Sequence, residues 1–287
     1  MEQLTTRAYA KINLGLDVIQ KLPNGYHQVK MVMQAIDLWD ELTLEKAESG
    51  IVLTTDAEGL PTDGSNLICR AAGLMRDAFS LKEGLKIHLR KRIPMAAGMA
   101  GGSADGAAAI AGINRLFRLG LPVSELMRIS VAVGADVPFC ILGGTALAEG
   151  IGEELTSLPP LPPCHIVVAK PDLEVSTKFV YEHLDARGLT EHPDIDGMVT
   201  AVREGSLPGI IHRMQNVLES VTIPAYPVIA AIKDKMLSLG AAGSLMSGSG
   251  PAVFGIFTEE DTAKEAFRQL KAYSPAKQVF LTAPFHR

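Results

Sequence analysis

The segment from Pro94 to Asp105 holds the residues whose types and spacing best suit chemistry. Three glycines, Gly98, Gly101 and Gly102, fall within five residues, and two methionines are the only large side chains between positions 95 and 104. Small residues let a backbone approach a ligand closely and point its N–H groups at it. Because an alanine-rich, helix-forming run follows, the segment predicts a phosphate site at a helix N-terminus. The alternative is a small-residue helix packed tightly against a sheet.

The loop differs from the two common nucleotide-binding templates. A Walker A loop needs a lysine before its serine or threonine, and here Gly102 directly precedes Ser103. The glycine spacing also differs from the G-x-G-x-x-G pattern of dinucleotide-binding folds. Any nucleotide must therefore be held in another way, with help from residues elsewhere in the chain.

Polar residues in two apolar segments could complete such a site. Lys11 and Asn13 share one face of an expected strand, because side chains two positions apart point the same way. Asp136 lies in an apolar run, where burial requires a partner, and Lys11 could supply one. The alternatives are a solvent-facing strand surface for Lys11 and Asn13, and a turn or helix-cap position for Asp136.

Two turns carry further candidates. Gly248, Ser249 and Gly250 could form a second glycine loop facing the first, or only a tight turn between two strands. Tyr26 and His27 follow a turn, where they could stack on a base and hydrogen-bond its edge. The alternative for this pair is to cover a sheet edge.

The elements that must position these residues form an α+β pattern. Hydrophobic periodicity predicts strands at 8–19, 29–36, 41–46, 51–55, 85–91, 165–169, 244–247, 252–257 and 278–282. It predicts helices at 66–79, 107–117, 124–133, 176–184, 195–203, 210–220, 225–239 and 259–272. Asn66 and Ser124 are the expected N-caps of two helices. Prolines in 158–163 predict a boundary between two lobes, 1–158 and 164–287.

The composition limits the class of protein. With 287 residues, of which 47% are hydrophobic and 21% charged, the chain suits an ordinary globular protein of two lobes. The net charge of −5 disfavours broad binding to nucleic acid or to an anionic membrane. The sequence shows neither a membrane span nor a signal peptide. Because Cys69, Cys140 and Cys164 lack metal-binding spacing, we expect reduced structural cysteines and a soluble, cytoplasmic protein.

Taken together, these segments resemble three motifs of the GHMP kinase family, in the family's order. The motifs correspond to residues 10–16, 94–105 and 247–252, and the resemblance covers nearly the whole chain. It implies an α+β, two-lobed fold with the active site in the cleft between the lobes. The implied N-terminal lobe contains a left-handed βαβ unit, and the implied C-terminal lobe is ferredoxin-like.

Within the family, the likeness is strongest to the kinases that act on a CDP-linked methylerythritol. It rests on residues 11–14, 24–27, 66–68 and 134–139. The implied reaction transfers the γ-phosphoryl group of ATP, with Mg²⁺, to the 2-hydroxyl of that small-molecule substrate. A mevalonate- or homoserine-type kinase and a non-catalytic nucleotide-binding regulator are the alternatives. The oligomeric state, monomer or homodimer, is left open.

The resemblance implies roles for the catalytic and nucleotide-binding residues. Asp136 would accept the proton of the hydroxyl, and Lys11 would keep Asp136 ionised and lower the pKa of that hydroxyl. Asn66 would lie near the adenine, or serve only as a helix cap. Ser103 would contact the phosphates or the Mg²⁺ that ATP carries, without a metal site in the protein. The implied phosphate loop consists of Pro94, Ala97, Gly98, Met99, Ala100, Gly101, Gly102, Ser103 and Ala104.

The resemblance also implies a set of substrate contacts. Tyr26 would stack on the cytosine, His27 would bond its edge, and Asn13 would hold the substrate near its hydroxyl. Thr177 and Tyr181, one helical turn apart, would approach from the second lobe, with Phe179 as a competing aromatic. The glycine motif of Gly248, Ser249 and Gly250 would line the cleft.

Two positions depart from the usual family loop. Ala100 and Ala104 stand where many members have glycine and serine. If position 100 requires a positive φ, Ala100 carries backbone strain there. Ala104 removes one hydroxyl from the expected phosphate site.

Overall fold

The structure, a computed structural model, describes residues 3–189 and 191–286 and divides into two compact units. Unit 1 comprises Met1–Ala10, Leu38–Met95 and Ala100–Leu142, and unit 2 comprises Lys11–Asp37, Ala96–Met99 and Gly143–Arg287. The units do not coincide with the consecutive lobes 1–158 and 164–287 that the proline-rich segment predicts. The reason is that two long strands, β1 (Gln3–Lys21) and β2 (His27–Ala47), each pass from one unit into the other.

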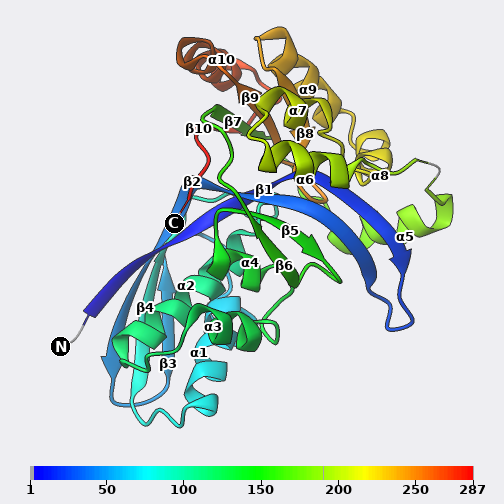
Figure 1. Cartoon of the computed structure of the whole chain (residues 1–287). Coiled ribbons are helices and arrows are strands. Elements are labelled where there is room, and N and C mark those ends of the chain that lie inside the picture. Colours follow the sequence, from blue (N-terminus) through cyan, green and yellow to red (C-terminus); the bar gives the residue numbers. More distant parts are fainter. Residues whose placement is uncertain (1–2, 190, 287) are drawn as a thin grey trace. The chain divides into compact units, whose positions relative to one another are not determined.

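Unit 1 combines strands with a layer of helices (Figure 1). Its elements are β3 (Ile51–Thr55), α1 (Leu67–Ala78), β4 (Gly84–Arg90), α2 (Gly101–Leu116), α3 (Val123–Ser130) and α4 (Val137–Leu142). Strands β3 and β4 are parallel and joined through α1, and β4 pairs antiparallel with the second half of β2. Buried and exposed residues alternate along β4, so one face of these strands is apolar. Helix α1 packs on β3 and α2, and α2 packs on α4.

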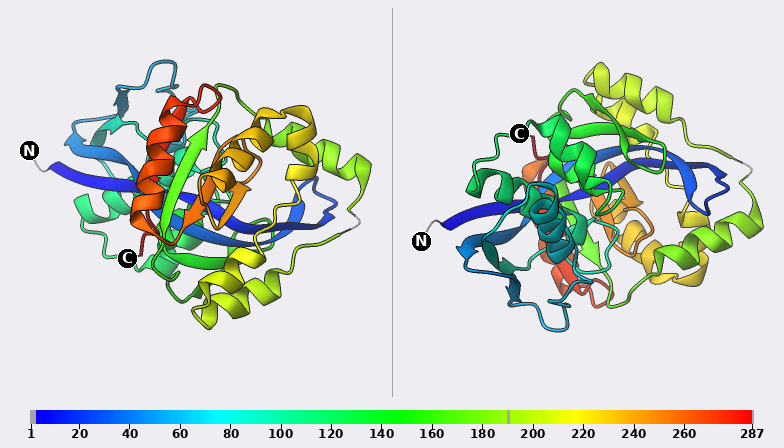
Figure 2. Two further views of the ribbon diagram at one scale, coloured as in Figure 1. Left: turned by 90° about the horizontal axis from the view of Figure 1, so that it is seen from above. Right: turned by 90° about the horizontal axis from the view of Figure 1, so that it is seen from below.

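Unit 2 contains an antiparallel sheet of four strands in the order β10-β7-β9-β8. Helices α9 and α10 contact this sheet and lie together on one of its faces (Figure 2). Strands β5 and β6 pair with each other, and β5 pairs with the first half of β2. The elements are β5 (Thr145–Glu149), β6 (Glu154–Leu158), β7 (His165–Lys170), α5 (Thr177–Arg187), α6 (Ile195–Arg203), α7 (Leu207–His212), α8 (Glu219–Ala225), α9 (Val228–Ser238), β8 (Gly243–Met246), β9 (Val253–Phe257), α10 (Glu260–Ala272) and β10 (Gln278–Thr282).

Several predicted elements differ from the structure. The strands expected at 29–36 and 41–46 form one continuous strand, β2. The helix expected at 210–220 is instead α7 and α8, because Gln215 and Val217 form backbone hydrogen bonds with Leu16 on β1 in place of helical ones. Helix α3 begins at Val123 after an N-cap at Pro122, so the prediction of Ser124 as the cap was wrong.

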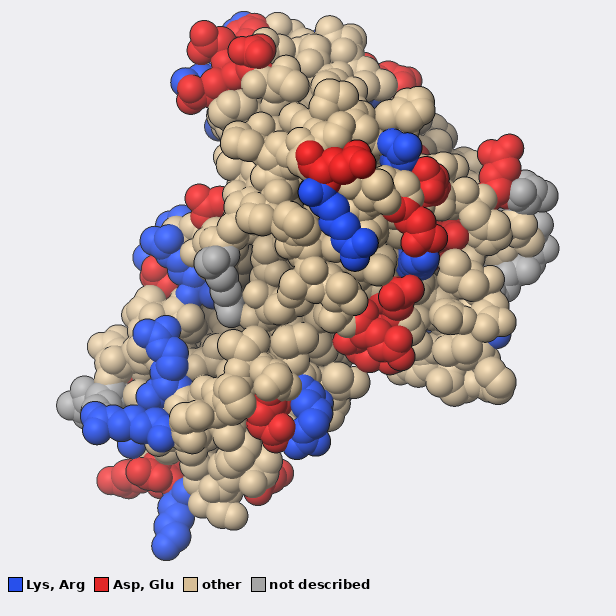
Figure 3. Space-filling model, in the orientation of Figure 1, with Lys and Arg blue, Asp and Glu red and all other residues tan. Residues whose placement is uncertain are grey.

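The surface carries charges of both signs. Acidic and basic side chains are interspersed on the face that Figure 3 shows. The three cysteines, all among the described residues, form no disulfide. Within the described part of the chain, every helix is too short or too polar to cross a membrane.

Candidate active site

Lys11 is the centre of a buried polar network in unit 2. Lys11 is 5% exposed and Asn13 is 0% exposed, so this face of β1 is buried and the solvent-facing alternative is wrong. The Nζ of Lys11 donates to Asn13 Oδ1 at 2.7 Å and to the carbonyl of Gly98 at 3.1 Å. Its backbone N–H donates to the carbonyl of Met99 at 3.1 Å. These bonds compensate the burial of the ammonium and join the N-terminal motif to the glycine loop.

The C-terminal glycine motif contacts the same part of the loop. Ser247 Oγ donates to the carbonyl of Gly98 at 3.0 Å, and the N–H of Ala252 donates to the carbonyl of Ala97 at 3.3 Å. Gly98 has a φ of +73°, and a Cβ there would lie 2.1 Å from the carbonyl oxygen of Ser247. The second glycine segment therefore faces the first, and it also forms a tight turn, in which the N–H of Gly250 donates to the carbonyl of Ser247 at 2.9 Å.

Asn216 supports this glycine motif, and sequence reasoning missed it. Its Nδ2 donates to the carbonyls of Met246 and Gly248, each at 2.8 Å, and its Oδ1 accepts from the N–H of Leu218 at 3.0 Å. The residue falls within the helix expected at 210–220. An asparagine is a poor interior helix residue, and that was the one available signal.

The remainder of the loop, in unit 1, leads directly into α2. Ala100 precedes the helix in the left-handed conformation (φ 54°, ψ 30°), as expected if this position requires a positive φ, and no side chain caps the helix. Ala96, in the part of the loop that belongs to unit 2, is a second left-handed alanine, with a φ of 49°. The N–H groups of Gly101, Gly102 and Ser103 belong to the first turn, where a helix offers them no internal acceptor. This arrangement suits an anion.

Other predicted loop residues are less accessible. Pro94, Ala97, Met99 and Ala104 are buried. The N–H of Ala104 already donates to the carbonyl of Ala100 at 2.8 Å inside the helix. Phosphate contacts from these residues stay predictions, and their burial favours a supporting role.

Asn66 is the N-cap of α1, as predicted. Its Oδ1 accepts from the N–H of Ile68 at 2.9 Å, and its Nδ2 donates to the carbonyl of Pro61 at 2.7 Å. Both ends of the amide therefore hold local backbone. A contact of Asn66 with adenine stays a prediction.

The structure brings several predicted substrate residues together in unit 2. The rings of His27 and Tyr181 lie 4.8 Å apart between centroids, tilted by 35°. The hydroxyls of Thr177 and Ser249 are hydrogen-bonded at 2.9 Å. Phe179 instead contacts the ring of His183, with centroids 3.9 Å apart. Of the two competing aromatics, Tyr181 is thus the one beside His27.

Tyr26 and Asp136 occupy partly open positions. Tyr26 is 59% exposed, and its N–H donates to Asn24 Oδ1 at 3.0 Å within the turn. Asp136 lies in unit 1 directly before α4 and is half-buried, so its charge is not enclosed in the core as the apolar run suggested. Lys11 belongs to unit 2, and the pairing of Lys11 with Asp136 stays a prediction.

Family comparisons decide which class of protein this site belongs to. Residues 66–144 match the family model described as "GHMP kinases N terminal domain", and residues 198–276 match "GHMP kinases C terminal". The chain belongs to the GHMP kinase family. As a GHMP kinase it is a phosphotransferase that uses ATP.

Individual relatives of this GHMP kinase match it over nearly their full length. A 4-diphosphocytidyl-2-C-methyl-D-erythritol kinase of Lachnospira eligens is 50% identical, and the match covers 99% of both chains. An enzyme of the same name from Lachnoclostridium phytofermentans is 49% identical over 99% of this chain and 98% of its own. A crystal structure of 4-(cytidine 5'-diphospho)-2C-methyl-D-erythritol kinase matches with a TM-score of 0.83, 33% identity and coverage of 99% and 100%. These matches confirm the α+β, two-domain fold class.

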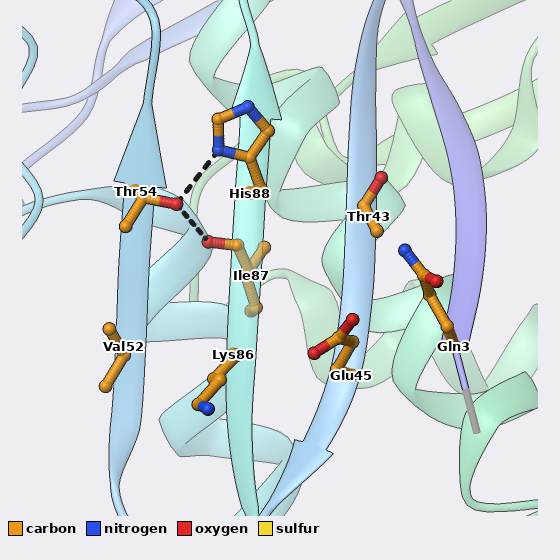
Figure 4. Close-up of a pocket in the computed structure, with 8 residues that line it drawn as sticks. All are labelled: Gln3, Thr43, Glu45, Val52, Thr54, Lys86, Ile87 and His88. Carbon is orange, nitrogen blue, oxygen red and sulfur yellow. Dashed lines mark hydrogen bonds between the residues drawn. The ribbon is translucent and has the colours of Figure 1, made fainter. Parts of the chain in front are cut away.

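A groove in unit 1 of this GHMP kinase carries none of the predicted site residues. It lies on the face of β1, β2, β3 and β4 that points away from the helices (Figure 4). Thr54 Oγ1 is hydrogen-bonded to His88 Nδ1 at 2.9 Å there. Its other lining residues are Gln3, Thr43, Glu45, Val52, Lys86 and Ile87. The groove is the open surface of the sheet.

Proposed function

We propose that this GHMP kinase transfers the γ-phosphoryl group of ATP to the 2-hydroxyl of 4-diphosphocytidyl-2-C-methyl-D-erythritol. Two relatives that are about half identical over almost the entire chain carry the name of that activity. The observation that carries the proposal is the buried network around Gly98. Its carbonyl accepts from both Lys11 and Ser247, so one peptide group connects the three motifs.

The first turn of α2 would hold the phosphates of ATP. Ala100 enters the helix without a side-chain cap, which leaves the N–H groups of Gly101, Gly102 and Ser103 for the phosphate oxygens. Among the described residues, no group of three His, Cys, Asp or Glu side chains could hold a metal ion. As the family resemblance implies, Mg²⁺ would be carried by ATP and touched by the Ser103 hydroxyl, and the ion would neutralise charge on the phosphates.

Lys11 and Asp136 would act on the accepting hydroxyl. Bonds to Asn13 and Gly98 use two of the three N–H groups of the Lys11 ammonium and fix its position. The third N–H is left for an oxygen of the substrate or of Asp136. Asp136 would accept the proton as the hydroxyl attacks. Because Asn13 is fully buried, we infer that it orients Lys11 rather than contacting the substrate.

Aromatic residues would recognise the cytosine. Tyr26 would stack on one face of the base, and its exposure supports this. His27 would bond the edge of the base, with Tyr181, whose ring touches it, covering the other face. Thr177, tied to Ser249, would add a hydroxyl at the same end.

The first experiment measures ATP consumption with Mg²⁺ and each of three alcohols: the cytidyl substrate, mevalonate and homoserine. Wild type is compared with Asp136→Asn. We expect turnover with the cytidyl substrate alone, and its loss in the variant. Turnover with mevalonate or homoserine would support a kinase activity but refute the cytidyl compound as the substrate. No turnover with any alcohol, despite ATP binding, would favour a nucleotide-binding regulator.

A matched pair of aromatic variants tests the cytosine site. Tyr181→Ala should raise the KM for the cytidyl substrate by about tenfold, as expected for the loss of one stacking contact. Phe179→Ala lies on the same helix and removes a ring that pairs with His183 instead. Equal effects of the two substitutions would refute the assignment of Tyr181.

A further inference from the structure

Lys91 sits in a buried cluster of charges that includes none of the predicted site residues. Its Nζ donates to Asp40 and, at 2.9 Å, to Asp105. The side chains of Lys91, Asp40 and Asp105 are 8%, 0% and 4% exposed. Desolvating three charges costs several kcal/mol per ion, and buried ion pairs often stabilise no more than apolar residues would. Stability alone is therefore a weak explanation for the cluster.

The cluster holds the chain on both sides of the phosphate loop. Asp40 Oδ1 accepts from the N–H groups of Arg92 and Ile93, at 2.5 and 2.8 Å, directly before the loop begins. Asp105 lies one helical turn after Gly101, at the start of α2. One ammonium on Lys91 thus joins the segment that enters the loop to the helix that leaves it.

Gly101 is packed against the same ammonium. A Cβ at Gly101 would lie 3.0 Å from Lys91 Nζ and 3.1 Å from Ile93 Cγ2. Because Gly101 has no side chain, the backbone of the first helical turn lies close to Lys91. A displacement of Lys91 would be transmitted to the N–H groups of that turn without an intervening side chain.

The electrostatics show that Asp105 depends on Lys91. Burial raises the pKa of Asp105 well above its usual value, and Lys91 offsets this only in part. Asp105 Oδ1 is buried without a hydrogen-bond partner. Burial lowers the pKa of Lys91, but the charges of Asp105 and Asp40 outweigh this and raise it overall. One oxygen of Asp105 is thus buried unsatisfied, and the Lys91 ammonium donates to the other at 2.9 Å.

We propose that Lys91, Asp40 and Asp105 form a positioning cluster that fixes the first turn of α2 for the phosphates of ATP. This inference rests on the proposed role of the loop in holding ATP. None of the three side chains needs to touch the nucleotide. Their effect is on the placement of N–H groups, and a misplacement of about 1 Å can reduce activity about a hundredfold.

The test compares ATP affinity, and the KM for ATP and for the cytidyl substrate, in folded variants. Lys91→Met and Asp105→Ala should each weaken ATP binding and raise the KM for ATP about tenfold or more. The KM for the cytidyl substrate should stay nearly unchanged. Asp105→Asn keeps an oxygen that can accept from Lys91 and should stay near wild type. If Lys91→Met does not fold, Asp105→Ala serves as the test variant, because it retains the Lys91–Asp40 pair.

Lys170→Met is the matched control. Lys170 is 9% exposed, and its ammonium donates to the carbonyls of Pro171 and Leu173 in unit 2. Lys170→Met removes a buried lysine outside the cluster, so the KM for ATP and the KM for the cytidyl substrate should both stay at their wild-type values. Unchanged ATP affinity in folded Lys91→Met and Asp105→Ala would overturn the proposal, as would equal losses for both substrates.

Gly102→Val separates this proposal from the proposed role of the loop. A Cβ at Gly102 meets only Leu67 Cδ1, at 3.7 Å, so the variant should fold while its branched side chain blocks an incoming phosphate. If Gly102→Val binds ATP normally, the loop is not the phosphate site and both proposals fall. If only Gly102→Val loses ATP, the positioning role alone is refuted.

Discussion

Replacing Gly98 with alanine should damage the protein far more than the same change at Gly205, another left-handed glycine. Gly98 has a φ of +73°, and the added Cβ would lie 2.1 Å from the carbonyl oxygen of Ser247. Gly205 is the matched control, because it has a φ of +66° and nothing within 4 Å of an added Cβ. Both substitutions place alanine in the same backbone region, and only one meets a neighbour.

The magnitude follows from these contacts. The left-handed conformation costs alanine about 1–2 kcal/mol, and this is the whole effect expected at Gly205. At Gly98 the chain must also move by more than 1 Å to reach an ordinary contact of 3.4 Å. That shift breaks the bonds that the Gly98 carbonyl accepts from Lys11 and Ser247. A bond to a charged donor contributes about 1.5–3 kcal/mol and a neutral one about 1, giving a total of about 3.5–6 kcal/mol for Gly98→Ala.

Urea unfolding of both variants measures the difference, and turnover with ATP and the cytidyl substrate measures its effect on activity. Gly98→Ala should lose activity even where it remains folded, because Lys11 loses one of its two anchors. Gly205→Ala should retain wild-type turnover. If the two variants unfold within about 0.5 kcal/mol of each other, the packing argument around Gly98 is refuted.

Three further predictions concern single side chains. Ala100→Gly removes a left-handed alanine (φ 54°) and should raise the free energy of unfolding by up to about 1 kcal/mol in urea titrations. Burial raises the pKa of Asp105 above its usual 3.8, so the folded protein holds that proton more tightly than the unfolded chain. Protonated Asp105 therefore contributes stability at low pH, and this contribution is lost as the pH rises above about 4. The free energy of unfolding should fall there with a slope of at most about 1.4 kcal/mol per pH unit. Asp105→Asn should abolish this component of the pH dependence. Burial raises the pKa of Cys164 to about 12, so iodoacetamide at pH 8 should leave it unmodified until the protein unfolds.

The local features of the fold could be predicted from the sequence because their signals are local. Asn66 caps α1 as its residue type and position predict. Strand β3 and helix α6 have the predicted bounds, since each is a short periodic run between turn residues. The left-handed conformation of Ala100 was expected only on the condition that the glycine usual at this place in related loops has a positive φ, and it came from the family resemblance rather than from a local signal.

Contacts between distant segments could not be predicted in this way. The Lys91 cluster joins β2, the residue directly after β4 and the start of α2, and neither carboxylate lies at a sequence distance from Lys91 that signals pairing. Asn216 takes its role from carbonyls 30 and 32 positions away. The sequence predicted two strands, 29–36 and 41–46, where β2 is continuous. Asp40 lies in the gap between them and is a buried acceptor for the backbone of Arg92 and Ile93, a contact with a distant segment that no local pattern signals.

The three glycines of the loop, which look alike in the sequence, have different structural reasons to lack a side chain. Gly98 is required by its positive φ and by the carbonyl of Ser247, and at Gly101 an added Cβ would make a tight contact of 3.0 Å with the ammonium of Lys91. These two positions are explained by contacts within the protein. At Gly102 an added Cβ would make only an ordinary contact with Leu67 and would need no unusual backbone. Protein packing does not account for a glycine at this exposed position of the first helical turn, whereas the proposed close approach of a phosphate would account for it.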